Sequence, residues 1–201
     1  MIVVIDYKAG NLYNVGNALK YLKAEFVFSG DPAVVIRADK VILPGVGSAR
    51  AAMDSLAAQD LVQVLQRLRV PFLGICLGLQ LLFEVSEEDN TQCLGILPGA
   101  VRRFNSSQVK VPHIGWNQVV GVGGFSQPPP SLLQDISEES FFYFVHSYFA
   151  PLVDSVTLGQ TEYGNWFGSL VVQDNFYGVQ FHPERSGEVG LKVLQNFLEV
   201  Q

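Results

Sequence analysis

A cysteine lies between two closely spaced glycines in the segment Phe72–Gln80, which reads Phe-Leu-Gly-Ile-Cys-Leu-Gly-Leu-Gln. This pattern predicts a strand that ends at Gly74-x-Cys76-x-Gly78 and turns directly into a helix, the arrangement called a nucleophile elbow. We expect strained backbone at Cys76, and a position at the helix N-terminus that favours the nucleophilic thiolate. The alternative interpretation is a free cysteine buried in an apolar strand.

A histidine and a carboxylate follow another apolar strand near the end of the chain. The segment Gly178–Glu184 puts His182 at the strand end and Glu184 two residues later. Because residues i and i+2 of an extended chain face the same side, we expect the carboxylate to contact the imidazole. A cysteine nucleophile needs a base, and the base needs an orienting group, so Cys76, His182 and Glu184 could form a catalytic triad. A chance His–Glu pairing at a strand end is the alternative.

Two further features suit the same chemistry. The segment Leu43–Gly47 follows a strand, and its glycines let the backbone approach a substrate closely. Gln80 lies four residues after Cys76, on the same helical face, so we expect its amide in the same pocket. A plain strand-to-helix turn and a solvated glutamine are the alternatives. The candidate N–H donors to a developing oxyanion are those of Gly45, Val46, Gly47 and Leu77.

Strands and helices alternate in the first half of the sequence. Short apolar runs separated by helical patterns predict a parallel sheet covered on both faces, with a ligand site at the carboxyl ends of the strands. The expected strands are 2–5, 25–28, 40–43 and 70–75, and the expected helices are centred on 12–22, 51–56 and 60–68.

The second half is richer in strands and predicts a mixed or antiparallel extension of the sheet. Gly121–Pro130 is expected to be a loop, and a last helix starts near Gly187. The expected strands are 101–104, 119–122, 141–145, 156–161, 169–172 and 178–181.

The composition excludes several classes of protein. The chain has 201 residues, of which 48% are hydrophobic, and a net charge of −6, which predicts one domain with a large core. We expect no nucleic-acid partner, because there is no basic patch, and no membrane span, because no stretch of 18 apolar residues exists. Two cysteines, Cys76 and Cys93, predict no disulfide framework and a reducing, cytoplasmic setting. No short spacing of ligands suggests zinc, and no metal is expected.

Three segments, taken together, resemble the class I (triad-type) glutamine amidotransferases. They are Pro-Gly-x-Gly at 44–47, Gly-Ile-Cys-Leu-Gly-Leu-Gln at 74–80 and Gln-Phe-His-Pro-Glu at 180–184. Pro-His-Ile-Gly-Trp-Asn at 112–117 and Tyr-Phe-Val-His-Ser-Tyr at 143–148 narrow the resemblance to the glutaminase subunits of imidazole glycerol phosphate synthase. The resemblance implies an α/β, flavodoxin-like three-layer fold with a mostly parallel central sheet and an antiparallel extension. It implies a single amidotransferase domain over residues 1–201.

The resemblance also implies roles for individual residues. Cys76 attacks the side-chain amide of L-glutamine, His182 protonates the leaving ammonia and then activates water, and Glu184 orients His182. The family binds its substrate near positions that correspond here to Gln80, Ser147 and Tyr148. No cofactor is implied.

The implied partner is a (β/α)8-barrel cyclase subunit in a heterodimer. It would receive the ammonia and make imidazole glycerol phosphate and aminoimidazole carboxamide ribotide in histidine biosynthesis. Arg185 departs from the lysine that is common in the family, which leaves its contact with the partner open in detail. The candidate interface residues are Asn11, Asn14, His113, Trp116, Asn117 and Arg185.

Two other functions are compatible with parts of the pattern. The first is a glutaminase subunit of a different complex, although such families lack the 112–117 segment. The second is a non-catalytic binding module, against which the intact Cys76, His182 and Glu184 argue. We also expect the Gly45-Val46-Gly47 peptide to be misaligned in the lone subunit and to align when the partner carries its ligand.

Overall fold

The structure is a computed structural model that describes residues 1–8, 12–121 and 132–201. Within these residues, eight strands form one sheet in the order β2-β1-β3-β4-β14-β13-β12-β9. The first five are mutually parallel: β2 (Phe26–Ser29), β1 (Ile2–Ile5), β3 (Lys40–Gly45), β4 (Phe72–Cys76) and β14 (Phe176–Val179). The remaining strands run antiparallel: β13 (Trp166–Gln173), β12 (Thr157–Glu162) and β9 (Val120–Gly121).

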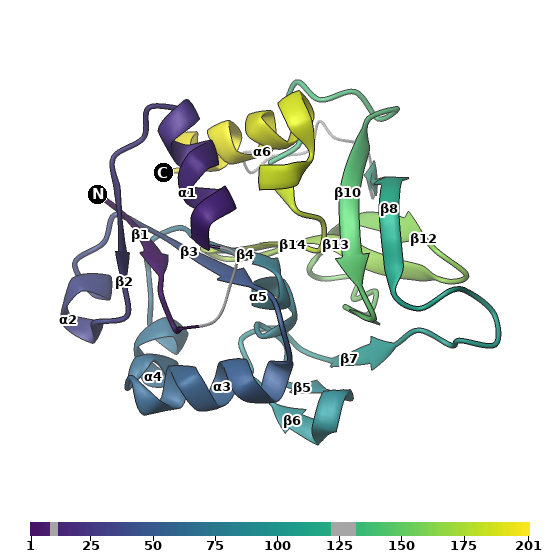
Figure 1. Cartoon of the computed structure of the whole chain (residues 1–201), viewed down its shortest axis with the longest axis horizontal. Helices are drawn as coiled ribbons and strands as arrows, with labels where there is room; N and C mark the ends of the chain where they lie inside the picture. Colours follow the sequence, from purple (N-terminus) through teal and green to yellow (C-terminus); the bar gives the residue numbers. More distant parts are fainter. Residues whose placement is uncertain (9–11, 122–131) are drawn as a thin grey trace.

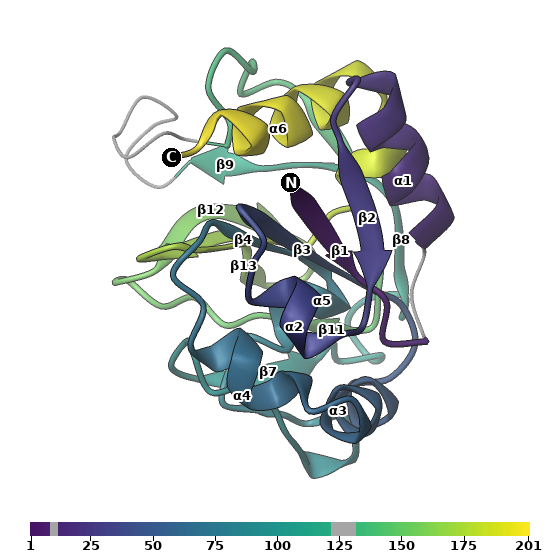
Figure 2. The same cartoon turned by 90° about the vertical axis from the view of Figure 1, so that its left-hand side faces the viewer.

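Helices cover both faces of this sheet (Figures 1 and 2). α1 (Leu12–Tyr21) and α6 (Gly187–Glu199) lie on one face, and α3 (Ala49–Ala58) and α4 (Leu61–Gln66) lie on the other. Alternating strand residues supply the two cores. Val4 packs in the cluster that includes the buried side of α1 and α6, whereas Val3 packs in the cluster of α3 and α4. The expected three-layer α/β fold is confirmed.

Smaller sheets flank the carboxyl end of the parallel strands. β8 (His113–Gln118) pairs antiparallel with β10 (Phe141–His146), and the two form a ribbon beside the main sheet (Figure 1). A second small sheet has the order β11-β7-β5-β6. Its strands are β11 (Tyr148–Phe149), β7 (Ala100–Arg103), β5 (Val85–Ser86) and β6 (Thr91–Gln92). The short helices are α2 (Pro32–Val35) and α5 (Leu77–Gln80), with 3₁₀ turns at Glu88–Asn90 and Pro183–Arg185.

Several boundaries differ from the sequence-based expectation. The strand expected at 119–122 corresponds to the two-residue β9, and the preceding strand β8 was not expected. β14 begins two residues before the expected Gly178 and ends before His182. The expected loop at 121–130 falls almost wholly outside the described residues. α2, β5, β6 and β11 were not expected, and all four are short.

Candidate active site

The turn at Cys76 has the geometry of a nucleophile elbow. Cys76 has φ 54° and ψ −106°, an unfavourable conformation for a non-glycine residue that costs about 1–3 kcal/mol. A Cβ on Gly74 would lie 2.5 Å from the Gly78 carbonyl oxygen, and a Cβ on Gly78 would lie 1.9 Å from that of Leu43. The two glycines therefore allow β3, β4 and α5 to pack against one another.

The helix after the elbow is short. α5 has four residues, so its cumulative dipole is small and contributes little to stabilising a thiolate. Leu77 is its first residue, and the N–H of a first helical residue has no partner inside the helix. This N–H is therefore available to an oxygen atom that binds beside Cys76.

His182 and Glu184 contact each other in the interior. His182 Nδ1 lies 2.8 Å from Glu184 Oε1, and the two side chains are only 3% and 1% exposed. The expected reason for this contact is wrong, because residues 183–185 form a 3₁₀ turn rather than extended chain. The tight turn after Pro183 brings the carboxylate back under the imidazole.

The charges around His182 favour its protonated form. Burial lowers the pKa of His182, but the Cys76 sulfur and then the Glu184 carboxylate outweigh burial and raise this pKa to about 10. Within the described residues, His182 Nε2 and Glu184 Oε2 are buried without a hydrogen-bond partner. His182 Nε2 is therefore the ring nitrogen left to exchange protons with the sulfur or with a bound substrate.

A cavity of about 350 Å³ opens above the cysteine. Its lining includes most of the residues that the sequence singled out: Cys76, His182, Val46, Gly47, Leu77, Gln80, Ser147 and Tyr148. Glu184 lies behind His182. Gly45 is absent from the described lining, and it packs instead against α5, where a Cβ would lie 2.6 Å from that of Leu77. The structure therefore gives Gly45 a packing role, and Val46 and Gly47 are the residues that face the cavity.

The 45–47 peptide lies beside a buried tyrosine. Burial and then the Cys76 sulfur raise the pKa of the Tyr7 hydroxyl, whereas the N–H of Val46 lowers it. Among the described residues, the Tyr7 hydroxyl oxygen is buried without a hydrogen-bond partner. Gly47, at φ +97°, supplies the left-handed conformation of this turn.

A small aromatic cluster carries two of the candidate interface residues. Trp116 is 56% exposed and makes an edge-to-face contact with Tyr143, at 5.9 Å between ring centroids. The Arg185 guanidinium lies 4.3 Å from the centroid of the same Tyr143 ring. Trp116 and Arg185 are therefore joined on one surface through Tyr143.

The other interface candidates are distributed differently. His113 is 3% exposed, so the expectation that its side chain forms part of a partner surface is wrong. Along a strand successive side chains alternate, and Trp116 faces outward whereas His113 faces the core. Asn117 donates to the Glu162 carbonyl at 2.9 Å, and Asn14 is half-buried on α1. Asn11 lies outside the described residues.

Three polar residues in the site were missed by sequence reasoning: His146 and Glu88, which line the cavity, and Gln180. Gln180 Nε2 lies 3.7 Å from Cys76 Sγ, and Gln180 Oε1 accepts from Gln80 Nε2 at 3.1 Å. His146 lines the cavity. The available signal was alternation, because position 180 precedes His182 by two residues and His146 ends an alternating strand.

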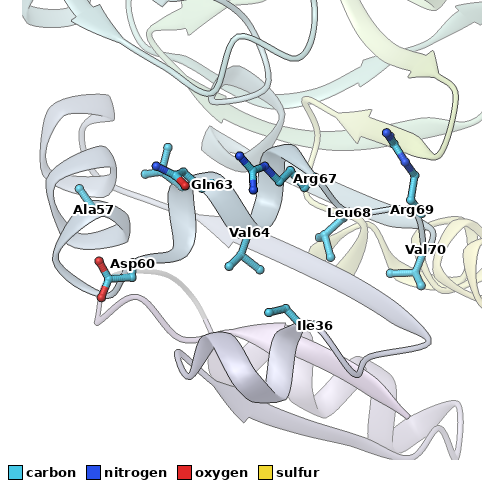
Figure 3. Close-up of a pocket in the computed structure, with 10 residues that line it drawn as sticks. Ile36, Ala57, Asp60, Gln63, Val64, Arg67, Leu68, Arg69 and Val70 are labelled. Carbon is cyan, nitrogen blue, oxygen red and sulfur yellow. The ribbon is translucent and has the colours of Figure 1, made fainter.

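A larger hollow of about 820 Å³ lies elsewhere, at the ends of α2 and α4 (Figure 3). Its described lining is mostly apolar around Ile36, Val64 and Leu68, with Arg67 and Arg69 at the rim, and it contains neither cysteine nor histidine. Among the described residues, no group of three potential metal ligands gathers, and no helix is long and apolar enough to cross a membrane. Among the described residues, the side chains suited to catalysis therefore lie around the cavity at Cys76.

Comparison with known proteins assigns this arrangement to a family. The sequence profile described as "Glutamine amidotransferase class-I" matches residues 3–200. The "Imidazole glycerol phosphate synthase subunit HisH" of Bacillus thuringiensis (strain Al Hakam) is 44% identical over 201 residues, which cover 98% of this chain and 93% of that protein. The protein of the same name from Photorhabdus laumondii is 42% identical over 205 residues and 99% of each chain. This chain belongs to the HisH family of class I glutamine amidotransferases.

Solved structures of other amidotransferases share the fold of this HisH family member. A crystal structure titled as a glutamine amidotransferase superposes with a TM-score of 0.75 at 18% identity, over 100% of this chain and 98% of that one. A putative GMP synthase subunit from Thermoplasma acidophilum gives 0.72 at 19% identity, over 99% and 92%. At these identities the likeness concerns the fold alone.

Proposed function

We propose that this amidotransferase hydrolyses L-glutamine with Cys76 as nucleophile, His182 as general acid and base, and Glu184 as the group that orients His182. The observation that carries the proposal is the cavity in which a strained, inward-facing cysteine meets a buried His–Glu pair, 2.8 Å apart, that favours the imidazolium. Function of this kind fits the family to which the chain belongs, and the assignment of each role rests on the geometry.

The reaction begins with the sulfur attacking the substrate's side-chain amide carbon. The developing oxyanion accepts hydrogen bonds from the N–H of Leu77 and from the Val46–Gly47 peptide. The imidazolium of His182 gives its Nε2 proton to the leaving nitrogen, so ammonia departs and a γ-glutamyl thioester remains. His182, now neutral, removes a proton from water as the water attacks the thioester, and glutamate leaves with Cys76 restored.

The polar groups around the cavity fit the rest of the substrate. Gln80 Nε2 donates to Tyr148 O, and Gln80, Ser147 and Tyr148 all line the cavity. We infer that Gln80 contacts the substrate carboxamide and that Ser147 and Tyr148 bind the α-amino and carboxylate groups. We also propose that residues 1–201 form a single amidotransferase domain.

The proposal extends to a partner, because the names of the relatives describe a subunit of imidazole glycerol phosphate synthase. We infer a heterodimer with a (β/α)8-barrel cyclase that consumes the ammonia for histidine biosynthesis, in the cytoplasm, where two free cysteines stay reduced. The surface formed by Trp116, Tyr143 and Arg185 is the candidate contact, since exposed aromatic and arginine side chains are enriched at interfaces.

The test compares glutamine-dependent synthesis with synthesis from added ammonium salts in the complex with the cyclase. Cys76→Ala should reduce glutamine-dependent synthesis by at least about 10³-fold, because the nucleophile is lost. Synthesis from added ammonium salts should remain, because the cyclase needs only ammonia. Cys93→Ala is the matched control and should retain both. Loss of both activities in Cys76→Ala would contradict the proposal, since the cysteine would then support structure rather than amide hydrolysis.

A second experiment tests the state of the oxyanion peptide. The two glycines that flank the β-branched Val46, with Gly47 at φ +97°, support the hypothesis that this peptide is misaligned in the lone subunit. Glutaminase turnover should therefore rise from the chain alone, to the chain with its partner, to the complex with the partner's nucleotide ligand. Equal rates in all three conditions would overturn this hypothesis and leave the triad unaffected.

A further inference from the structure

Gln180 is a buried amide in direct contact with the reacting sulfur, and the chemistry above leaves it unused. Its side chain is fully buried, and its Nε2 lies 3.7 Å from Cys76 Sγ. We propose that Gln180 is a catalytic hydrogen-bond donor to the Cys76 thiolate, and that the Tyr148 carbonyl imposes this orientation through Gln80. The inference rests on the proposed function, because it requires Cys76 to be the nucleophile.

The Tyr148 carbonyl decides which way both amides face. A carbonyl oxygen can only accept, so the atom of Gln80 that lies 2.7 Å from it must be the NH₂ nitrogen. The same nitrogen lies 3.1 Å from Gln180, so the facing atom of Gln180 must be its acceptor oxygen. The NH₂ group of Gln180 is left facing the sulfur. Neither amide can be reversed without setting two donors or two acceptors against each other.

The Tyr148 carbonyl also contacts a histidine. His146 Nδ1 lies 2.8 Å from Tyr148 O, so it must carry a proton and donate it. His146 Nε2 is then an acceptor, and it receives the Nδ1 proton of His113 at 3.0 Å. Gln80 is 4% exposed and His146 is 6% exposed, so water has little access to exchange with these bonds. The donor and acceptor roles in this series of hydrogen bonds are therefore fixed by protein groups alone.

The two contacts of the sulfur favour opposite protonation states. A protonated thiol can donate to the Val145 carbonyl, 3.9 Å away, whereas a thiolate cannot. The NH₂ of Gln180 donates to sulfur, and hydrogen bonds to a charged acceptor are stronger than those to a neutral one. Gln180 therefore stabilises the thiolate. With a helix of only four residues after the elbow, this side-chain donor supplements a weak helix dipole.

The titratable groups near the sulfur are His182, which pairs with Glu184, and Tyr7. Glu88, His146 and Tyr148 line the same cavity. None of them is altered by a change at Gln180. A shift in the reactivity of Cys76 on substitution of Gln180 would therefore report on the amide itself rather than on the triad.

The test measures iodoacetamide alkylation of Cys76 in the full chain between pH 5 and 10, followed by mass spectrometry of the Cys76 peptide so that Cys93 is scored separately. Gln180→Glu replaces the donor with an acceptor, and Gln180→Leu removes the donor without adding charge. Each should move the midpoint of the alkylation profile to higher pH by about one unit, equivalent to roughly tenfold slower labelling at pH values below the midpoint, with the larger shift in Gln180→Glu. Gln173→Glu is the matched control, because Gln173 donates to Ile96 O away from the site.

A further variant tests the orientation. Gln80→Leu removes the donor that faces Gln180 Oε1, so Gln180 is free to reverse, and the midpoint should again move upward by a smaller amount. If Gln80 only bound substrate, alkylation by a small reagent would be unchanged.

The outcomes distinguish this inference from the proposed function. Profiles of Gln180→Glu and Gln180→Leu that overlay that of the parent would overturn the inference, while a reactive parent cysteine would leave the nucleophile in place. If Gln180→Glu does not fold, Gln180→Leu decides the result. Failure of the parent Cys76 to react at any pH would overturn both.

Discussion

The histidines of this protein occupy two neighbouring regions with opposite electrostatics. His182 is buried against Glu184 and the Cys76 sulfur, which together raise its pKa to about 10. His113 and His146 are buried against each other, and burial lowers the pKa of His113 to about 4 and that of His146 to about 3. Burial lowers the pKa of all three histidines, so the difference between their pKa values comes from the charged groups that each one contacts.

The surroundings of the histidine pair explain why it stays neutral. His113 is stacked between Phe144 and Tyr163, with ring centroids 5.0 Å and 4.0 Å away. Phe104 contacts both imidazoles, and no carboxylate forms an ion pair with either among the described residues. Without a counter-charge, the hydrogen bonds that remain are those of neutral rings.

The comparison shows how one residue type serves two purposes a short distance apart. A neutral pair with fixed tautomers can only hold its neighbours in place, since it neither gains nor loses a proton near neutral pH. A histidine that is charged beside a sulfur can deliver a proton. The positive charge of His182 also lowers the pKa of His146, so the charged histidine helps to keep its neighbour neutral.

The largest expected effect comes from removing the carboxylate that distinguishes the two regions. Glu184→Gln keeps the shape but can present an NH₂ group to His182 Nδ1, which favours the wrong tautomer. Glutaminase activity of the complex should fall by about 10³-fold or more. Steady-state kinetics with glutamine and with ammonium would measure this effect. Glu199→Gln, at the exposed end of α6, is the control, and activity of Glu184→Gln within tenfold of the parent would contradict the assigned role.

The neutral pair should make the fold sensitive to acid. Because the folded pKa values of His113 and His146 lie below the unfolded value of 6.5, their contribution to stability is complete above that pH and is lost as pH falls toward about 4 and 3. Between pH 6 and 5 the free energy of unfolding should drop steeply, with a slope approaching that for the uptake of two protons. Urea unfolding at several pH values measures this slope. A flat profile between pH 6 and 5 would contradict the neutral assignment.

The charged region should respond in the opposite direction. The folded pKa of His182 lies above 6.5, so its contribution is complete below that pH and is lost as pH rises through about 10. Cys76→Ala removes the largest cause that raises this pKa, and the pKa of His182 should fall while those of His113 and His146 barely change. Histidine NMR titration of the variant reports all three. An unchanged His182 would mean that Glu184 alone sets its charge.

The smallest expected effect lies at the outer end of the neutral pair. Asn117 Nδ2 lies 3.4 Å from His113 Nε2, a long hydrogen bond. Asn117→Asp puts an acceptor and a charge there, so the pKa of His113 should rise by less than about one unit. The same titration detects the shift, and Asn105→Asp in the exposed turn after β7 is the control. A fall in the pKa of His113 would show that the carboxylate does not reach the ring.

Local signals in the sequence predicted the parallel half of the fold and the central residues of the site. The elbow around Cys76 is readable because its glycines and cysteine must occur at fixed spacing. The ribbon strand β8 was missed, because a glycine and polar residues interrupt its apolar Ile114 and Trp116 and its partner β10 lies more than twenty residues away in the sequence. Long-range pairing of this kind leaves little trace in a local pattern.

The same difference between local and long-range signals applies to the contacts of the histidines and of the glutamine amides. His182 stands beside its carboxylate in the sequence, so their contact could be expected, although the turn that makes it could not. The contact of His146 with His113 joins positions 33 residues apart, and that of Gln180 with Gln80 joins positions 100 apart. Only the folded chain reveals that one carbonyl oxygen, Tyr148 O, orients both the histidine pair, through His146, and the amide pair, through Gln80.

The most direct test of the account is ¹⁵N NMR of the three histidine rings in the folded chain from pH 5 to 9. The account predicts that His182 carries protons on both ring nitrogens at pH 7, while His113 and His146 each carry one proton, on Nδ1, throughout this range. A neutral His182 at pH 7, or a His146 that titrates near 6.5, would contradict it.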